Sequence, residues 1–90
     1  MNYEIHPDLN RVLTKLAKKD RKQFENILRK IDQIIDNSNP DHYKNLKYPL
    51  HKYKRVHVTG SFILLFRFEK DIVVFRHYDH HDNIYLKKYE

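Results

Sequence analysis

The hydrophobic period of this chain changes once, and the change separates two kinds of secondary structure. Before residue 37, apolar residues recur every three or four positions, which is the spacing of the buried stripe of an amphipathic helix. After residue 52, apolar residues alternate with polar ones or form short apolar runs, as they do in strands. A chain of 90 residues has room for a single core. The helices must therefore cover a sheet that the second half of the chain forms.

Two helices are expected in the first half, after a short strand from Met1 to Ile5 that Pro7 ends. Asp8 and Asp20 are suitable caps for the starts of the two helices. The apolar stripes consist of Leu9, Val12, Leu13 and Leu16, and of Phe24, Ile27, Leu28, Ile31, Ile34 and Ile35. Residues 18–20 between the stripes are too few for anything but a tight turn, so the helices should form an antiparallel hairpin.

Three strands are expected in the second half, at residues 53–58, 62–68 and 72–78, and residues 83–89 are expected to form a short helical tail. Alternation in the first of these strands puts Arg55 and His57 opposite Val56 and Val58. The nearly continuous apolar run of residues 62–68 is typical of a strand covered on both faces. The order of elements predicts one α+β domain over residues 1–90, with an N-terminal strand and an antiparallel helical hairpin packed on a mainly antiparallel four-stranded sheet.

The positive charge of the chain is concentrated in one window. The whole sequence has 18 Lys and Arg against 12 Asp and Glu, a net charge of +6. From His42 to Phe68 there is no acidic residue. The basic residues of this window are Lys44, Lys47, Lys52, Lys54, Arg55 and Arg67. A local excess of positive charge favours a polyanionic partner, most often nucleic acid.

Other features of the composition exclude several classes of protein. The chain has no Cys, which excludes disulfides and thiolate metal sites. No apolar run approaches the roughly 20 residues that a membrane-spanning helix needs. We therefore expect a soluble, cytoplasmic protein that needs no cofactor.

The candidate catalytic residues are His57, His81 and Tyr85. If the strands pair in sequence order, His57 and His81 come within reach of one ligand, and an imidazole titrates near pH 6.5, so one can act as a base and the other as an acid. Tyr85 follows His81 by four residues and would share its side of a helical turn. Two plainer interpretations stay open. His57 can be an ordinary exposed strand histidine, and Tyr85 can simply pack the tail against the sheet.

The candidate nucleic-acid contacts surround His57 in the sequence. They are His51, Lys52, Lys54, Arg55 and Arg67. The run from His77 to Asp82 also suggests a metal site, but His80 and His81 are adjacent and would diverge in an extended chain. Because no H-E-x-x-H or C-x-x-C pattern accompanies them, we predict no metal site.

One ordered pattern resembles a known family. It consists of Lys54-Arg55-Val56-His57-Val58, then Ser61 to Arg67, then His80-His81-Asp82-Asn83-Ile84-Tyr85. Together with the length and the order of elements, this pattern is similar to the RelE/ParE superfamily of toxins from bacterial and archaeal toxin–antitoxin modules, and more closely to its RelE/YafQ branch. The resemblance covers essentially the whole chain.

The resemblance implies an endoribonuclease that enters the ribosomal A site and cuts the messenger there without a metal. In this chemistry the substrate's own 2′-hydroxyl attacks the phosphorus, and the 5′-oxygen leaves. The resemblance matches His57, His81 and Tyr85 to the residues that surround the scissile phosphate in the YafQ-like branch. It matches Lys52 and Lys54 to lysines that make a large contribution to catalysis in RelE.

The chain also departs from the family pattern. Ser61 stands where YafQ-like members tend to have Asp, which removes a candidate acid or orienting group. Tyr48 occupies roughly the place of another family histidine, with His51 nearby.

The resemblance also implies a partner, a RelB-like antitoxin that is acidic and partly helical and folds on contact with the toxin. Two rival functions remain. A toxin of the ParE type shares the fold but inhibits DNA gyrase by binding, without a cleavage site. A plain RNA-binding domain would show salt-sensitive RNA binding and no cleavage.

Overall fold

The computed structural model describes residues 2–36, 52–87 and 89. In chain order the elements are β1 (Asn2–Ile5), α1 (Pro7–Lys19), α2 (Arg21–Asp36), β2 (Lys54–Thr59), β3 (Phe62–Glu69), β4 (Ile72–His80) and α3 (His81–Ile84). The predicted α+β class and order of elements are confirmed. Within these residues, no helix has both the length and the apolar character that crossing a membrane requires.

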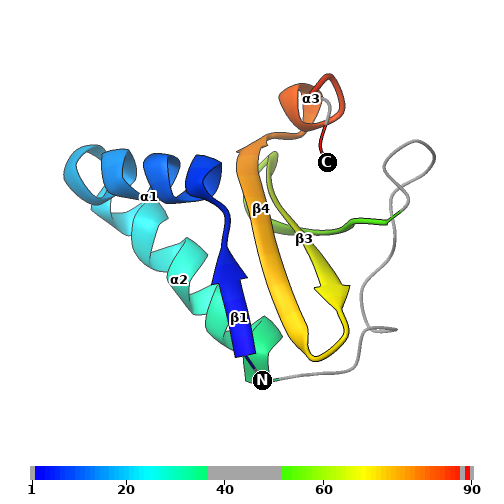
Figure 1. The fold of residues 1–90 in the computed structure, drawn as a ribbon. Coiled ribbons are helices and arrows are strands. Elements are labelled where there is room, and N and C mark those ends of the chain that lie inside the picture. The colour runs from blue at the N-terminus through cyan, green and yellow to red at the C-terminus, as the bar shows by residue number, and fades with distance from the viewer. Residues whose placement is uncertain (1, 37–51, 88, 90) are drawn as a thin grey trace.

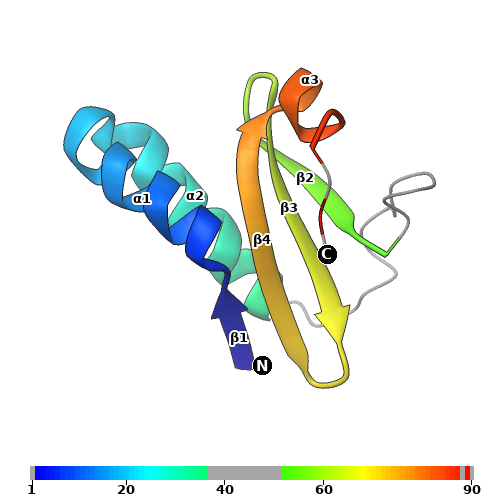
Figure 2. The same ribbon diagram turned by 45° about the horizontal axis from the view of Figure 1, so that its top comes forward.

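The sheet has the strand order β1-β4-β3-β2. Strands β2, β3 and β4 form an antiparallel meander, and β1 pairs in parallel with β4. This agrees with the expected mainly antiparallel sheet. The hairpin of α1 and α2 lies on one side of the sheet, and α3 lies on the other (Figures 1 and 2). We call the side of the sheet away from the hairpin the open face.

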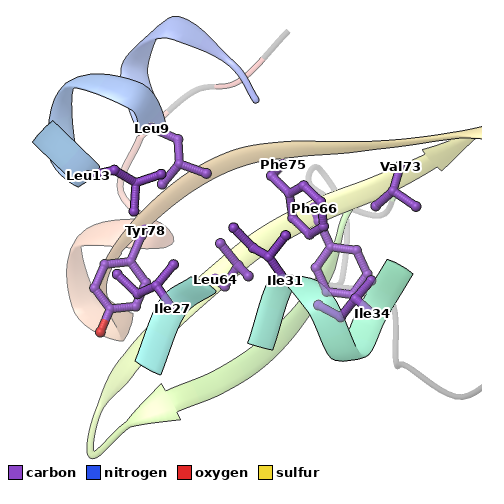
Figure 3. Packing of buried hydrophobic residues seen from close by; sticks show 10 residues of the cluster. All are labelled: Leu9, Leu13, Ile27, Ile31, Ile34, Leu64, Phe66, Val73, Phe75 and Tyr78. Carbon is purple, nitrogen blue, oxygen red and sulfur yellow. The ribbon is translucent and has the colours of Figure 1, made fainter. Parts of the chain in front are cut away.

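The main core fills the space between the hairpin and the sheet. Figure 3 shows its ten buried residues, which are Leu9, Leu13, Ile27, Ile31, Ile34, Leu64, Phe66, Val73, Phe75 and Tyr78. A second, smaller cluster on the open face contains Tyr53, Ile63, Leu65 and Ile84, all fully buried. Strand β3 contributes to both clusters, which confirms that it is a central strand covered on both faces.

The start of α1 differs from the prediction. The N-cap is His6 rather than Asp8, and its Nδ1 accepts the backbone N–H of Asp8 at 3.1 Å. Pro7 begins the helix because a proline at the first position needs no hydrogen-bond acceptor and has the φ angle of a helix. Asp8 is left to pair with Arg76 on β4 at 2.9 Å. The predicted cap of α2 is confirmed, since Asp20 Oδ1 accepts the N–H of Gln23 at 3.1 Å.

Two further details of the sequence interpretation were wrong. Leu28, placed on the buried stripe of α2, is 37% exposed and lies in a groove between α2 and α1 that Leu13 and Phe24 also line. The tail helix begins at His81 and ends at Ile84, whereas residues 83–89 were expected to be helical. Its start is set by His80, whose Nδ1 accepts the N–H of Asp82 at 3.2 Å.

Strand β4 contains an irregularity that the sequence pattern did not indicate. Leu65 of β3 pairs with His77, but the next residue, Phe66, pairs with Phe75, so Arg76 is an extra residue in β4. The side chains of Phe75 and Tyr78 both join the main core, three positions apart rather than two. Such a bulge turns the intervening side chains, Arg76 and His77, away from the hairpin core.

Candidate active site on the open face of the sheet

Strand β2 presents Arg55 and His57 on the open face. Val56 and Val58 pack against the main core, so alternation along the strand directs the residues between them to the other side. Arg55 pairs with Leu65, and His57 pairs with Ile63, both of which belong to the small open-face cluster. Arg55 is half-buried and His57 is exposed. The predicted faces of this strand are therefore confirmed.

Helix α3 brings Tyr85 to Arg55. Ile84 is fully buried against the small cluster and anchors α3 on the open face. Tyr85 caps the C-terminal end of α3, and its hydroxyl oxygen accepts a hydrogen bond from Arg55 Nη1 at 2.5 Å. The Tyr85 side chain remains accessible, since the residue is 45% exposed. Two predicted site residues that are 30 positions apart in the chain thus meet.

His81 is the first residue of α3, and the turn between β2 and β3 holds its backbone. The N–H of His81 donates to the carbonyl oxygen of Ser61 at 2.8 Å. Ile63, the partner of His57, pairs on its other side with Asp79, two residues before His81. His57 and His81 therefore belong to the same end of the sheet, where α3 lies beside the β2–β3 turn (Figure 2).

The His81 ring lies against an acidic neighbour and is partly open to solvent. Its Nδ1 is 2.6 Å from a carboxylate oxygen of Asp82, and the side chain is 43% exposed. The two atoms are close, but the direction of the ring nitrogen does not suit a hydrogen bond. The contact is thus an ion pair only when the imidazole is protonated, and the exposed remainder of the ring can meet a ligand.

The other predicted nucleic-acid contacts do not all lie near Arg55 and Tyr85. Lys52 is exposed, with its Nζ 5.5 Å from the centre of the Tyr53 ring. Lys54 opens β2 opposite Phe66, so alternation assigns it to the hairpin side of the sheet. Arg67 pairs with Glu69 at 3.0 Å, and its Nη1 donates to the Tyr53 hydroxyl at 3.2 Å. His51 and Tyr48 lie outside the described residues.

Asp79 fixes the corner between β4 and α3, a role that sequence reasoning missed. Its Oδ1 accepts the backbone N–H of His80 at 2.7 Å and the side-chain amide of Asn83 at 3.2 Å. Burial raises the pKa of Asp79, but these hydrogen bonds and the Lys87 ammonium lower it by more, so the carboxylate is ionised at neutral pH. Asp79 and Asn83 are four positions apart in the sequence, and this spacing could have indicated that their side chains meet.

Three residues of this corner could offer ligands to a metal ion. In the part of the chain that the structure describes, one ligand atom each of His80, His81 and Asp82 lie within 4.8 Å of one another. They are consecutive residues, so chain adjacency alone brings them together. One nitrogen of His80 already accepts the N–H that begins α3. We assign no metal to this group.

The arrangement on the open face suits proton transfer around an anion. Arg55 donates to the phenol oxygen of Tyr85, which leaves the phenol proton and the remaining guanidinium N–H groups available to a ligand. Guanidinium groups bind phosphate oxygens with charge-assisted hydrogen bonds. An imidazole ring has one nitrogen that can accept a proton and one that can donate, so His57 and His81 can each take part in proton transfer.

Comparison with known proteins identifies relatives over most of the chain, although no family model matches it. The chain is 48% identical over 87 residues to the RelE4 protein of Methanocaldococcus jannaschii, which is named as a candidate toxin. The match covers 94% of this chain and 90% of RelE4.

Solved structures show the same fold. YafQ from Escherichia coli has a TM-score of 0.75 at 18% identity, and the match covers 93% of this chain and 97% of YafQ. A YafQ chain in the DinJ–YafQ complex of E. coli has a TM-score of 0.71 at 20% identity, covering 93% and 97% of the two chains. These likenesses concern the fold, whereas the identity to RelE4 is high enough to establish kinship. The chain therefore belongs to the RelE family of toxins.

Proposed function

We propose that this chain is the toxin of a toxin–antitoxin system and that it cuts messenger RNA on the ribosome. The observation that supports the proposal most strongly is the contact between Arg55 and Tyr85, which joins β2 to α3 on the open face. His57 lies two residues from Arg55 on the same strand face, and His81 begins the helix that ends at Tyr85. Membership in the RelE family supports the same activity.

In the proposed reaction the substrate supplies its own nucleophile. One of the imidazoles of His57 and His81 removes the proton of the 2′-hydroxyl, and the bond from the 2′-oxygen to phosphorus forms. The bond from phosphorus to the 5′-oxygen breaks, and that oxygen takes a proton from the other imidazole or from Tyr85. The products are a 2′,3′-cyclic phosphate and a 5′-hydroxyl. Positioned acid–base groups contribute about 10²–10⁴-fold to such a rate.

Arg55 stabilises the charge that develops on the phosphorus oxygens. The phosphorane carries more negative charge than the starting diester, so a fixed cation binds the transition state more strongly than the substrate. The hydrogen bond to Tyr85 holds the guanidinium in place before the substrate arrives. The accessible Tyr85 ring also offers a surface on which a base can stack. Lys52, which is exposed two residues before β2, adds positive charge beside the path of the RNA.

The partners follow from the same reasoning. The net charge of +6 favours a polyanionic surface such as that of the ribosome and its message. An antitoxin that covers this surface should be acidic and partly helical, and should fold on contact. The crystallised complex of DinJ with YafQ shows that a protein of this fold is held by a partner chain.

Cleavage of a message on translating ribosomes tests the proposal, with primer extension to map the cut. We expect His57→Ala and His81→Ala each to slow cleavage by about 10²-fold or more. Lys22→Ala, an exposed change on α2, is the control and should cleave at the wild-type rate. Wild-type cleavage by both histidine variants would overturn the assignment. A gyrase supercoiling assay of the same protein separates this function from that of ParE-type toxins, because inhibition of gyrase without RNA cleavage would favour the latter.

A further inference from the structure

The bulge in β4 opens onto a cavity that the proposed active site does not use. The cavity has a volume of about 370 Å³. Its lining comes from α1 (Asp8, Arg11, Val12 and Lys15), from the bulge (Arg76 and His77) and from the C-terminal tail (Lys87 and Tyr89). Because the bulge makes Arg76 and His77 share one side of the strand, two adjacent residues line the same cavity.

The cavity has an excess of positive charge. Four cationic side chains line it, against the single carboxylate of Asp8. That carboxylate contacts both Arg11 and Arg76, and the hydrogen bond from Arg76 does most to lower its pKa. Lys87 has a partial partner in Asp79, at 3.5 Å. Lys15 is exposed and has no ion-pair partner among the described residues. Among the described residues, the positive charges that line the cavity therefore outnumber the negative ones.

His77 adds a buried hydrogen-bond donor. Its side chain is 9% exposed, and burial, followed by the Lys87 ammonium, lowers its pKa, so the ring is neutral at neutral pH. Nε2 lies 3.0 Å from Lys87 Nζ and 3.7 Å from the nearest Asp79 oxygen. An ammonium group can only donate, so Nε2 accepts and the ring proton is on Nδ1. Nδ1 is buried and has no hydrogen-bond partner in the part of the chain that the structure describes.

A cavity lined by four cationic side chains and one carboxylate is suited to an anion whose oxygen atoms accept hydrogen bonds. The Nδ1 atom of His77 is itself buried, so an anion in the cavity would meet the cationic side chains first. Arg76 is held ready for such a ligand, because Asp8 holds it at one side and the Tyr89 ring lies 5.1 Å from its guanidinium carbon.

We propose that this cavity is a second phosphate-binding subsite for the single-stranded RNA that the active site cuts. The proposal rests on the proposed function. Arg55 on β2 pairs with Leu65 on β3, and Leu65 pairs with His77 on β4, so the two sites lie in one row across the sheet with β3 between them. Two strand spacings separate Arg55 from His77 by about 10 Å. A single RNA strand has phosphates at regular intervals along its backbone, so one strand can place a phosphate in each site. A single carboxylate side chain of a protein partner cannot fill both sites.

Salt dependence of RNA binding tests the subsite. The probe is a short fluorescent single-stranded RNA with 2′-O-methyl groups throughout, which cannot be cleaved. Each phosphate contact contributes about 0.7 to the slope of log K against log salt concentration for single strands. We expect Lys15→Ala to weaken binding and to reduce this slope by about 0.7. Lys22→Ala removes an equally exposed helical lysine outside the cavity and should leave the slope unchanged.

A second measurement observes the cavity directly in the wild-type protein. Addition of the RNA should shift the NMR signals of the His77 ring, which lines the cavity, and inorganic phosphate at high concentration should shift them in the same direction. Equal slopes for the two lysine variants, or an unchanged His77 ring, would overturn the subsite. So would an effect of Lys15→Ala on antitoxin binding with none on RNA binding.

The outcomes for the subsite and for the nuclease can be told apart. If the slope falls in Lys15→Ala while the wild type cuts no message on ribosomes, the subsite stands and the nuclease proposal fails. If ribosomal cleavage depends on His57 and His81 while Lys15→Ala binds RNA with the wild-type slope, only the subsite fails.

Discussion

Replacement of Ile31 by Ala tests how α2 is oriented on the sheet. Ile31 is 4% exposed and packs in the main core among residues of α1, β3 and β4 (Figure 3). Truncation removes three carbon atoms and leaves a cavity that its neighbours fill only in part. Substitutions of Ile by Ala at such positions cost about 2–5 kcal/mol of the free energy of unfolding.

The expected loss is large for a domain of this size. Small domains have free energies of unfolding of about 5–15 kcal/mol. In a domain of 60–100 residues each kcal/mol lowers Tm by about 4–8 °C. A loss of about 3 kcal/mol therefore lowers Tm by about 12–24 °C. Urea unfolding monitored by circular dichroism gives the free energy, and a thermal melt gives Tm.

The matched control is Leu28→Ala, three residues earlier on the same helix. Leu28 is 37% exposed and lines a groove between α2 and α1, so its truncation removes less buried surface and should cost clearly less than that of Ile31. If Leu28→Ala destabilised the protein as much as Ile31→Ala does, α2 would be rotated relative to the arrangement described, and the packing argument would be refuted.

Three further results are expected. Asp20→Ala removes the cap of α2 and should cost about 1 kcal/mol in urea unfolding, whereas Lys19→Ala should cost little; equal losses would contradict the cap. The pKa of His77 is lowered on folding, so below pH 6.5 the unfolded chain binds a proton that the folded chain does not. Stability should therefore be complete above pH 6.5 and decrease as the pH falls towards 5, by at most about 1.4 kcal/mol per pH unit, and His77→Gln should flatten this dependence in melts across that range. Tyr85→Phe keeps the ring and loses the hydrogen bond to Arg55, so single-turnover cleavage should slow about 10- to 100-fold, in line with 1.5–3 kcal/mol for a hydrogen bond to a charged group, and an unchanged rate would show that the contact has no part in the reaction.

The spacing of apolar residues in the sequence was enough to predict most of the fold. The stripe that contains Ile27, Ile31 and Ile34 indicated the buried face of α2, and alternation in β2 assigned Arg55 and His57 to one side. Both signals depend on local geometry, in which the side-chain direction repeats every 3.6 or 2 residues. They therefore needed no knowledge of the tertiary structure.

The errors arose where one side chain had several suitable partners. Asp8 could cap α1, but the sequence did not show that Arg76, 68 positions away, would pair with it while His6 served as the cap. The bulge at Arg76 depends on the pairing of two strands, and alternation within either strand cannot show it.

Only part of the candidate site could be predicted, because contacts between elements that are distant in the chain leave no local pattern in the sequence. The sequence indicated which residues could do chemistry, but the contact of Arg55 with Tyr85 needs α3 to fold back over the sheet. Burial of Ile84 determines that placement, and the three-residue run Ile84-Tyr85-Leu86 is too short to show which of its residues is buried. The cavity beside His77 was missed because the sequence does not show the bulge that turns Arg76 and His77 to one side of β4.

The most direct test of the central claim is the requirement for the substrate's own 2′-hydroxyl. A message is first mapped on translating ribosomes to find the cut, and a second message is then made with a 2′-deoxynucleotide on the 5′ side of that cut. We expect the wild-type protein to leave this message intact at the mapped site, and to cut a control message that carries the deoxynucleotide two positions upstream. Cleavage of both messages at the same rate would contradict attack by the 2′-hydroxyl and, with it, the role given to the open face.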